Sequence, residues 1–382
     1  MRVLHVTRDF PPRHCGGLSA AVGGLAAAQR RHGWAPAVVS FDDWRPRVAN
    51  RTATPATEST HDGVTVLRLS CAAHLPAAHA FARALRPTVV HVHDGMLWEL
   101  AAALRDALGT PAVLELHVLH QRVSDLRGTR ERTLSLAAQE TALGAADRVI
   151  APSHAAAEAI LTTVPGLTPR LRVVPHGIDD WPAARAAAAR HAATPATGPM
   201  LSVGRFADVK GTPELFDVMQ SMLARQPETE FVVAGGIPAN RRAERRWLQR
   251  WHSRAPESQH ARVRWTGWLD ADALAAWYRD AAALIVPSRY ETFGLVALEA
   301  MLHGLPVAAS AVGGLTELIE HGRTGLLSPP GHTDALADHA AALLSDPALA
   351  CRLSRAAAAR VRATLLWEHV LPGLRAVYAE VS

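Results

Sequence analysis

The 382-residue chain is poor in cysteine and lysine. Its three cysteines, Cys15, Cys71 and Cys351, lie far apart and form no Cys-x-x-Cys pair. This number and spacing exclude a disulfide framework and a thiolate zinc site, and they favour a reducing compartment. Lys210 is the only lysine, so any chemistry that requires a lysine has one position available.

Long apolar runs and a strong net charge are also missing. No apolar run reaches the about 20 residues of a transmembrane helix. The apolar start of the chain turns polar at Thr7-Arg8-Asp9, so we expect no signal peptide. The formal net charge of +5 is modest and gives no indication of a nucleic-acid partner. We therefore expect a soluble cytoplasmic protein that does not associate with membranes.

Short β-branched and apolar runs recur along the chain, each followed by a longer Ala/Leu-rich amphipathic stretch. The expected strands are Val3–Val6, Ala37–Phe41, Val64–Leu69, Val89–Val92, Ala112–Leu116, Arg148–Ala151, Leu171–Val174, Met200–Val203, Phe231–Ala234, Val263–Thr266, Ala283–Val286 and Pro306–Ala309. Continuous apolar strands that alternate with helices are typical of parallel sheets covered on both faces. The sequence therefore predicts an α/β fold of two Rossmann-like, doubly wound domains.

The alternation breaks once, between Gly177 and Pro199, where an Ala/Thr/Pro-rich composition indicates a linker. We predict an N-terminal domain over 1–178, a linker over 179–199 and a second domain over 200–352. Residues 353–382 are expected to be helical and to pack back on the first domain. Because ligands of open parallel sheets bind beyond the carboxyl ends of the strands, we expect the two sheets to face a ligand cleft.

The segment Pro287–Met301 carries the most information about function. Glu291 precedes an expected helix, and Glu299 lies in its second turn. Backbone N–H groups at the start of such a helix form an anion site, here at Thr292, Phe293, Gly294 and Leu295. Two carboxylates beside an anion site suit a ligand that also offers hydroxyl groups, as a nucleoside diphosphate sugar does.

A second loop, Gly204–Gly211, follows the expected strand Met200–Val203. It offers the guanidinium of Arg205 and the ammonium of Lys210 at the carboxyl end of that strand. This pair suits a diphosphate leaving group, whose negative charge grows as its bond breaks.

Two features of the first half indicate a ligand. Gly16 and Gly17 separate the first strand from the first helix and allow a ligand to approach the backbone. The loop is no G-x-G-x-x-G fingerprint, which disfavours a dinucleotide. His117 follows the strand Ala112–Leu116, and an unperturbed pKa near neutrality would allow it to act as a general base.

His91, His93 and Asp94 form a further cluster at a strand end. We predict no zinc site here, because no matching second group of ligands follows in the sequence. Together with Asp94, the acidic residues Asp42, Asp43 and Glu99 would favour a cationic acceptor such as an aminocyclitol; solvated loop carboxylates are the alternative reading.

The spacing of Glu291 and Glu299 resembles the E-x7-E signature of the retaining GT-B glycosyltransferases of the large fourth family. The loop with Arg205 and Lys210 is similar to that family's G-R-x4-K-G loop. Further similar segments are Val174–Asp179, in which His176 replaces a common asparagine, Gly304–Val307, Val312–Glu317 and Gly322–Leu327.

The resemblance implies a nucleotide-sugar donor in the second domain, with UDP as the favoured nucleotide. It implies that Arg205 and Lys210 hold the pyrophosphate, that Glu299 binds the ribose and that Glu291 contacts the transferred sugar. No metal and no cofactor beyond the nucleotide sugar are expected.

The resemblance also assigns residues of the first domain, which is expected to present the acceptor hydroxyl. Gly16 and Gly17 would face the donor phosphates, and His117 would hold the donor sugar near the acceptor. The loop with His93 and Asp94 would lie near the acceptor. A small specialised metabolite or an aminocyclitol is the expected acceptor class, and the oligomeric state is not predicted.

Three alternatives stay open. A GT-B sugar-nucleotide epimerase would use the same donor without an acceptor. A phosphorylase would need a lysine-bound pyridoxal group, and the place of Lys210 in the phosphate loop disfavours it. A catalytically silent sugar-binding or partner subunit would keep the fold alone. The basic stretch Arg241–Trp251 favours a solvated helix face over a membrane contact, because Trp247, Leu248 and Trp251 form a core-facing stripe.

Overall fold

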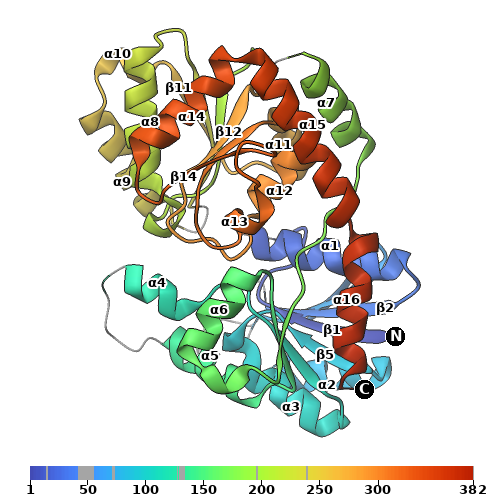
Figure 1. The fold of residues 1–382 in the computed structure, drawn as a ribbon. Helices are drawn as coiled ribbons and strands as arrows, with labels where there is room; N and C mark the ends of the chain where they lie inside the picture. Colours follow the sequence, from blue (N-terminus) through green and yellow to red (C-terminus); the bar gives the residue numbers. More distant parts are fainter. Residues whose placement is uncertain are drawn as a thin grey trace. The chain divides into compact units, whose positions relative to one another are not determined.

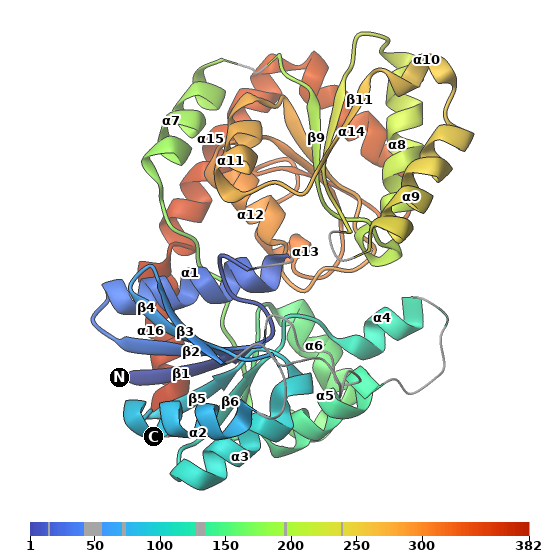
Figure 2. The same cartoon turned by 180° about the vertical axis from the view of Figure 1, so that it is seen from behind.

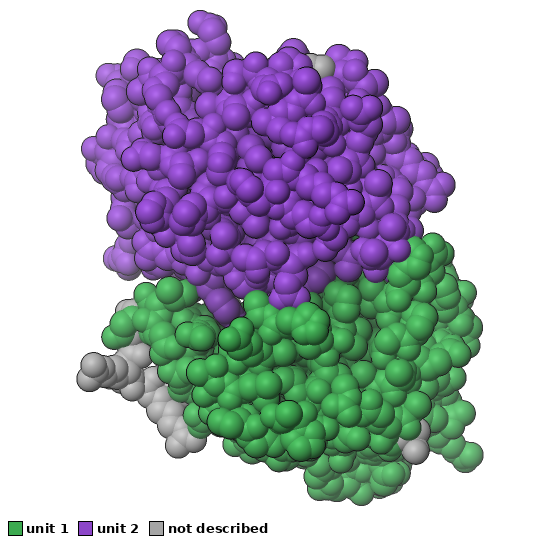
Figure 3. Space-filling model, viewed as in Figure 1, with its two compact units in different colours: residues 1–179, 367–382 green, residues 180–366 purple. Residues whose placement is uncertain are grey.

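The computed structural model describes residues 1–13, 16–41, 56–70, 74–126, 128, 134–194, 197–237 and 240–381. The chain forms two compact units, coloured separately in Figure 3. Unit 1 consists of residues 1–179 and 367–382, and unit 2 of residues 180–366. Each unit is a wholly or mainly parallel sheet with helices on its faces (Figures 1 and 2).

The sheet of unit 1 has the strand order β3-β4-β2-β1-β5-β6-β7-β8. Its strands are β1 (Arg2–Thr7), β2 (Ala35–Ser40), β3 (Thr57–His61), β4 (Val64–Arg68), β5 (Val89–Val92), β6 (Ala112–Glu115), β7 (Arg148–Ala151) and β8 (Leu171–Val173). All neighbours are parallel except β3 and β4. The strands β1, β5 and β6 are adjacent, so polar residues near their carboxyl ends are brought together.

The helices of unit 1 are α1 (Gly17–Arg31), α2 (Leu75–Leu85), α3 (Trp98–Leu108), α4 (His120–Leu126), α5 (Leu134–Ala145), α6 (His154–Thr163) and α16 (Trp367–Ala379), with 3-10 turns η2 (Gly95–Leu97) and η3 (Pro165–Leu167). The helix α16 comes from the end of the chain and completes this core. Its buried residues Trp367, Val370 and Tyr378 pack in one cluster with Val3 and Leu25.

The sheet of unit 2 has the order β11-β10-β9-β12-β13-β14, and all its neighbours are parallel. Its strands are β9 (Met200–Arg205), β10 (Phe231–Gly236), β11 (Val263–Gly267), β12 (Ala283–Val286), β13 (Val307–Ser310) and β14 (Leu326–Ser328). Its helices are α7 (Pro182–Ala193), α8 (Thr212–Arg225), α9 (Arg241–Arg254), α10 (Glu257–His260), α11 (Ala271–Asp280), α12 (Leu295–Leu302), α13 (Leu315–Leu318), α14 (Thr333–Ser345) and α15 (Pro347–Thr364), with a 3-10 turn η4 (Asp208–Lys210).

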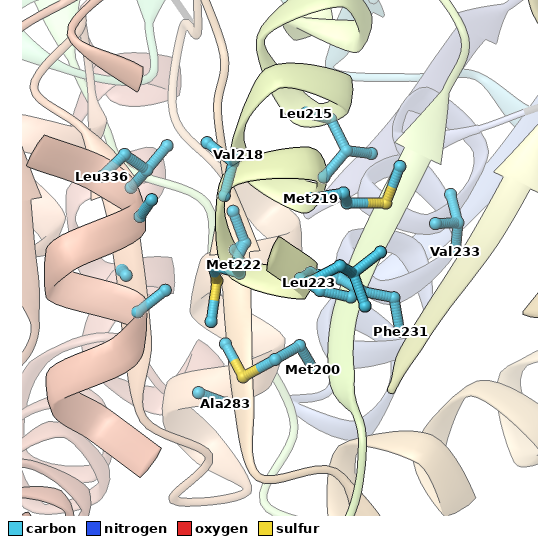
Figure 4. Close-up of a cluster of buried hydrophobic side chains, with 14 of the residues drawn as sticks. Met200, Leu215, Val218, Met219, Met222, Leu223, Phe231, Val233, Ala283 and Leu336 are labelled. Carbon is cyan, nitrogen blue, oxygen red and sulfur yellow. The ribbon is translucent and has the colours of Figure 1, made fainter. Parts of the chain in front are cut away.

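The core of unit 2 lies between its sheet and the helices α8 and α14. Figure 4 shows Met219, Met222 and Leu223 of α8 directed toward Met200 and Phe231 of the sheet. All five side chains are at most 1% exposed. This close-packed layer fixes β9, the strand from which the loop with Arg205 and Lys210 leaves.

The predicted α/β class with two parallel-sheet units is confirmed, and each predicted strand is present. Two strands were missed. The strand β3 is a polar, largely exposed edge strand paired antiparallel to β4, so it lacks the apolar pattern of the others. The strand β14 has only three residues, which is too short for a period to be recognised.

The predicted linker over 179–199 is wrong, because residues Pro182–Ala193 form the helix α7 of unit 2. This helix packs against α15 and buries Ala184 and Ala187. Alanine has the highest helix propensity and proline is favoured in the first turn. The Ala/Pro composition therefore indicates a helix here, and not a flexible segment.

The boundary between unit 2 and the C-terminal segment lies at residue 366, later than the predicted residue 352. The helix α15 contains residue 353 and belongs to unit 2, whereas α16 belongs to unit 1. The expectation that the end of the chain packs on the first domain is thus confirmed for residues 367–382. Among the helices of the described ranges, none has both the length and the apolar content needed to cross a membrane.

The docking of α16 generates a stability prediction. A Cβ atom at Gly177 would lie 2.4 Å from Cε3 of the buried Trp367 ring. We expect Gly177→Ala to lower the free energy of unfolding by about 1–3 kcal/mol, as for overpacked cores. Urea denaturation followed by circular dichroism measures this.

Gly166→Ala is the matched control, because a Cβ atom there meets no atom within 4 Å. Equal stability of the two variants would contradict the packing argument.

Candidate functional site

Two loops at the carboxyl ends of β9 and β12 pack against one another through their backbones. Gly211 has a φ of +69°, and a Cβ atom there would lie 1.8 Å from the carbonyl oxygen of Pro287. The N–H groups of Arg289 and Tyr290 both donate to the carbonyl of Val209, at 3.1 Å. The sequence thus needs glycine at 211 for the loop after β9 to contact the loop after β12.

This contact brings the lysine of one loop onto the glutamate of the other. The Nζ atom of Lys210 lies 2.9 Å from Oε1 and 2.8 Å from Oε2 of Glu291. The hydroxyl of Ser288 also donates to Oε2 of Glu291, at 3.2 Å. The side chains of Lys210 and Glu291 are 33% and 13% exposed, so a ligand can reach both.

Arg205 is the last residue of β9 and its side chain is exposed. Within the described ranges, no residue forms a hydrogen bond or an ion pair with its guanidinium. The structure therefore places Arg205 and Lys210 on one short loop, with the guanidinium open to an anionic ligand.

The backbone around Glu291 is held by a pair of glycines. A Cβ atom at Gly313 would lie 1.9 Å from the carbonyl oxygen of Glu291, and one at Gly314 would lie 2.5 Å from Cα of Phe293. The N–H of Gly314 donates to the carbonyl of Glu291 at 3.0 Å. The segment with Thr292 and Phe293 is thereby fixed before α12 begins.

The helix α12 begins at Leu295, after Gly294 in the left-handed region, and its second turn carries Glu299, as predicted. The hydroxyl of Tyr278, from α11, donates to Oε2 of Glu299 at 2.7 Å. Burial raises the pKa of Glu299, and the hydrogen bond from Tyr278 opposes that rise. Sequence reasoning missed Tyr278, because it lies in another helix and belongs to no motif.

In unit 1, a buried carboxylate is surrounded by imidazoles. Glu115 ends β6, and its Oε2 lies 3.2 Å from Nε2 of His91 and 3.3 Å from Nδ1 of His93. Its Oε1 lies 3.3 Å from Nδ1 of His176. The neighbouring imidazoles hold the pKa of Glu115 well below its ordinary value, although burial acts in the opposite direction.

His5 of β1 extends this cluster, with its Nδ1 2.9 Å from Nε2 of His93. Burial lowers the pKa of His5 to about 3. Sequence reasoning did not single out His5 or Glu115; the available signal was a polar side chain inside the apolar strands β1 and β6.

His117 lies at the border of this cluster, and its Nε2 is 3.1 Å from Nδ1 of His93. Its ring stacks on that of His176 at 5.1 Å between centroids. Burial lowers the pKa of His117 to about 3. The expected unperturbed pKa near neutrality is therefore wrong: the imidazole is neutral at pH 7 and a poor base.

His93 is buried behind His117, and Asp94 caps η2 by accepting from the N–H of Met96 at 2.9 Å. Asp94 also forms an ion pair with Arg8. The pairing gives this carboxylate a structural role that the sequence did not indicate.

Of the remaining predicted residues, those that the structure describes form no hydrogen bond or ion pair with the side chains described above. Gly16 and Gly17 stand at the start of α1, with a φ of 137° at Gly16. Glu99 is an exposed residue in the first turn of α3. Asp42 and Asp43 lie outside the described residues.

The predicted core-facing stripe of the basic stretch Arg241–Trp251 is confirmed. In α9, Trp251 is fully buried, and Trp247 and Leu248 pack against the core of unit 2. The arginines of this helix are exposed.

The glycine support of Glu291 generates the next prediction. Gly313 and Gly331 both have positive φ, +49° and +77°, but a Cβ atom at Gly331 meets no atom within 4 Å. Alanine costs about 1–2 kcal/mol at either position because of backbone strain. We expect Gly313→Ala to cost a further 1–3 kcal/mol, roughly, from its contact with the Glu291 carbonyl.

Parallel urea denaturation of the two variants isolates this contact. Equal losses of stability would show that the backbone of Glu291 is not held in this way.

Comparison with known proteins agrees with this geometry. Residues 199–346 match the family described as Glycosyl transferases group 1, and residues 15–181 match Glycosyltransferase Family 4. The chain is 30% identical to the glycogen synthase of Mycobacterium tuberculosis, over 99% of this chain and 94% of that protein. It is 32% identical to a D-inositol 3-phosphate glycosyltransferase of Pseudarthrobacter chlorophenolicus, over 72% of this chain and 67% of that protein.

A solved structure extends the comparison to the fold. The crystal structure of HepE from Anabaena in complex with UDP-glucose aligns over 99% of this chain and 100% of HepE, with a TM-score of 0.75 and 19% identity. The chain therefore belongs to the group 1, family 4 glycosyltransferases and has their GT-B fold.

Proposed function

We propose that this glycosyltransferase moves a sugar from a nucleoside diphosphate sugar, UDP being the favoured nucleotide, to an acceptor hydroxyl with retention of configuration. The observation that carries the proposal is the ion pair of Lys210 with Glu291, on the same loop as the open guanidinium of Arg205. Cations and a carboxylate side by side suit a ligand that joins a diphosphate to a hydroxyl-bearing sugar.

The diphosphate binds to Arg205 and Lys210. Both carboxylate oxygens of Glu291 accept hydrogen bonds from the Lys210 ammonium. The third N–H of this ammonium donates to a phosphate oxygen. Both cations stabilise the negative charge that develops on the leaving group. The transfer step is proposed to need no metal at the diphosphate, because these two cations supply the positive charge there.

The two glutamates bind the sugar parts of the donor. Glu299 is partly buried and accepts from Tyr278, and its carboxylate also accepts hydrogen bonds from the ribose. Glu291, held by Lys210 and by the Gly314 backbone, contacts the hydroxyls of the transferred sugar. The backbone N–H groups at Thr292, Phe293, Gly294 and Leu295 lie at the start of α12 and favour the negative phosphate.

The residues of unit 1 serve the acceptor side. A neutral His117 is suited to a hydrogen bond with the donor sugar, and Gly16 and Gly17 leave room for the phosphates. His93 orients His117 through their 3.1 Å contact. We assign His93 and Asp94 to the loop that lies near the acceptor. The departing phosphate oxygen, and not a histidine, takes the acceptor proton, which leads to attack on the face that the leaving group departs from.

The acceptor class is proposed from hydroxyl chemistry. The named relatives act on glycogen and on an inositol phosphate, and both acceptors present a dense set of ring hydroxyls. We infer a small polyhydroxylated acceptor, including an aminocyclitol. The choice of UDP is supported by HepE, which was solved with UDP-glucose.

The first prediction from this proposal concerns the donor site. We expect Glu291→Ala, Arg205→Ala and Lys210→Ala each to lower kcat by about two to three decades, as the loss of one electrostatic contact does at oxyanion sites. Steady-state transfer from a UDP-sugar measures kcat, and NMR of the product anomeric proton measures retention.

Arg225→Ala is the control, since Arg225 forms an exposed ion pair with Asp338. Near-wild-type kcat in the three site variants, or an inverted anomer, would refute the proposed function.

The second prediction concerns pH. Burial raises the pKa of Glu299, and the Tyr278 hydroxyl lowers it. Tyr278→Phe therefore raises this pKa further. A carboxylate that must accept from the ribose is lost as pH falls through its pKa, so nucleotide affinity should begin to fall at a higher pH in the variant than in the wild type. Calorimetric titration with UDP at a series of pH values measures this.

Tyr378→Phe makes the same chemical change in unit 1 and should leave the pH profile of UDP affinity unchanged. Superimposable profiles for Tyr278→Phe and the wild type would contradict the role of Glu299.

A further inference from the structure

A buried glutamine of α5 contacts the main chain directly after His117. Gln139 lies inside α5 and is 3% exposed. Its amide nitrogen Nε2 donates to the carbonyl of Val118 at 2.8 Å, and its amide oxygen Oε1 accepts from the N–H of His120 at 2.9 Å. One side chain therefore holds the two peptide groups on either side of Leu119.

These hydrogen bonds are made where the chain leaves the sheet and enters a helix. The N–H of Leu116 still bonds to the neighbouring strand, through the carbonyl of Ile150 at 3.0 Å, whereas α4 begins only at His120. The first N–H groups of a helix have no partner within the helix, and Oε1 of Gln139 satisfies one of them. Residues 117–119 connect the strand to the helix, so Gln139 supports the main chain where it changes from one to the other.

The two backbone partners require opposite hydrogen-bonding groups. The Val118 carbonyl needs a donor and the His120 N–H needs an acceptor, and an amide offers both in one plane. A carboxylate would turn an oxygen toward the Val118 carbonyl, and an apolar side chain would offer neither group. Glutamine at 139 is therefore matched to this segment in both length and polarity.

The same residue of α5 lies against the loop after β5. A Cβ atom at Gly95 would lie 2.8 Å from Cα of Gln139, so glycine at 95 allows α5 to approach η2. Gly95 directly follows Asp94 and lies two residues after His93. Gln139 thus connects the loop that carries His93 to the segment that carries His117.

The ring of His117 is held separately from its main chain. Its Nε2 lies 3.1 Å from Nδ1 of His93, and its ring stacks on that of His176 at 5.1 Å between centroids. These contacts orient the ring but leave the main chain after it without support. Gln139 supplies that support, because it fixes the peptide groups that follow His117.

We propose that Gln139 is a positioning residue for sugar transfer, which acts through His117 and touches no substrate. This inference rests on the proposed function, in which the neutral His117 forms a hydrogen bond with the donor sugar. Without Gln139, the peptide groups at residues 118 and 120 must turn toward other partners, because unpaired buried polar groups are costly. A displacement of about 1 Å in a group that holds the substrate can lower the rate by about 100-fold.

Gln139→Met tests the proposal, because it removes both hydrogen bonds and nearly keeps the length of the side chain. We expect kcat for transfer from a UDP-sugar to fall by about 10- to 100-fold. The Kd of UDP should stay unchanged, because Arg205, Lys210 and Glu299, which are proposed to bind it, belong to unit 2. Steady-state kinetics measure kcat, and calorimetry measures the Kd.

Gln220→Met is the matched control. Gln220 lies in α8 of unit 2, and its Nε2 donates to the carbonyl of Arg254 at 2.7 Å. This variant also loses a hydrogen bond from a glutamine side chain to a backbone carbonyl. It should keep the kcat of the wild type.

A double-mutant cycle with His117→Ala separates positioning from a general loss of structure. In the His117→Ala background, Gln139→Met should not lower kcat further, because the residue through which Gln139 acts is gone. A kcat loss of the same size in both backgrounds would overturn the proposal, and so would an unchanged kcat in a folded Gln139→Met protein.

The single variants distinguish this proposal from the proposed function. A loss of kcat in His117→Ala with none in Gln139→Met overturns only the positioning role. An unchanged kcat in His117→Ala refutes the sugar contact of His117, and the positioning role with it. If Gln139→Met fails to fold by circular dichroism, Gln139→Glu at about pH 8 replaces it in the same cycle, because an ionised carboxylate accepts from His120 but cannot donate to Val118.

Discussion

The arrangement of charged side chains in unit 2 depends on one contact between two loop backbones. Glycine at 211 lets the loop after β9 reach the carbonyl of Pro287, and glycines at 313 and 314 pack against the backbone of Glu291 and Phe293 in the other loop. Only then do Lys210 and Glu291 come within 2.9 Å of one another. A lysine on a long flexible side chain would otherwise be a solvated surface charge. The glycines thus hold two loops together as one edge, in which the charges of Lys210 and Glu291 are already paired.

In unit 1, the polar side chains are fixed in a different way, by burial. Glu115 and its surrounding histidines are buried near the carboxyl ends of adjacent strands, although a protein interior ordinarily holds apolar residues. Burial keeps the imidazoles neutral, so each becomes a fixed donor or acceptor and not a mobile charge. The order of the strands creates this cluster, and His117, at its border, receives its orientation from it.

Sequence patterns predicted what local signals encode. The apolar runs identified the strands of both sheets, and the spacing of Glu291 and Glu299 placed both carboxylates relative to α12. Contacts across elements were not predictable in this way. Tyr278 reaches Glu299 from α11, and Glu115 meets His91 and His176 only because of the strand order. The helix α7 was missed because alanine and proline suit both a linker and a helix start; its packing against α15 decides between them.

The central claim is that Arg205 and Lys210 form a diphosphate site that needs no metal. The most direct test is the melting temperature of EDTA-treated protein with UDP, GDP or ADP, each compared with the same protein without nucleotide, and then repeated with magnesium. A nucleotide at one hundred times its Kd adds about 2.7 kcal/mol of stability. The account predicts that one of the three, UDP by expectation, raises the melting temperature in the presence of EDTA. A shift that requires magnesium, or none from any of the three at millimolar concentration, would contradict it.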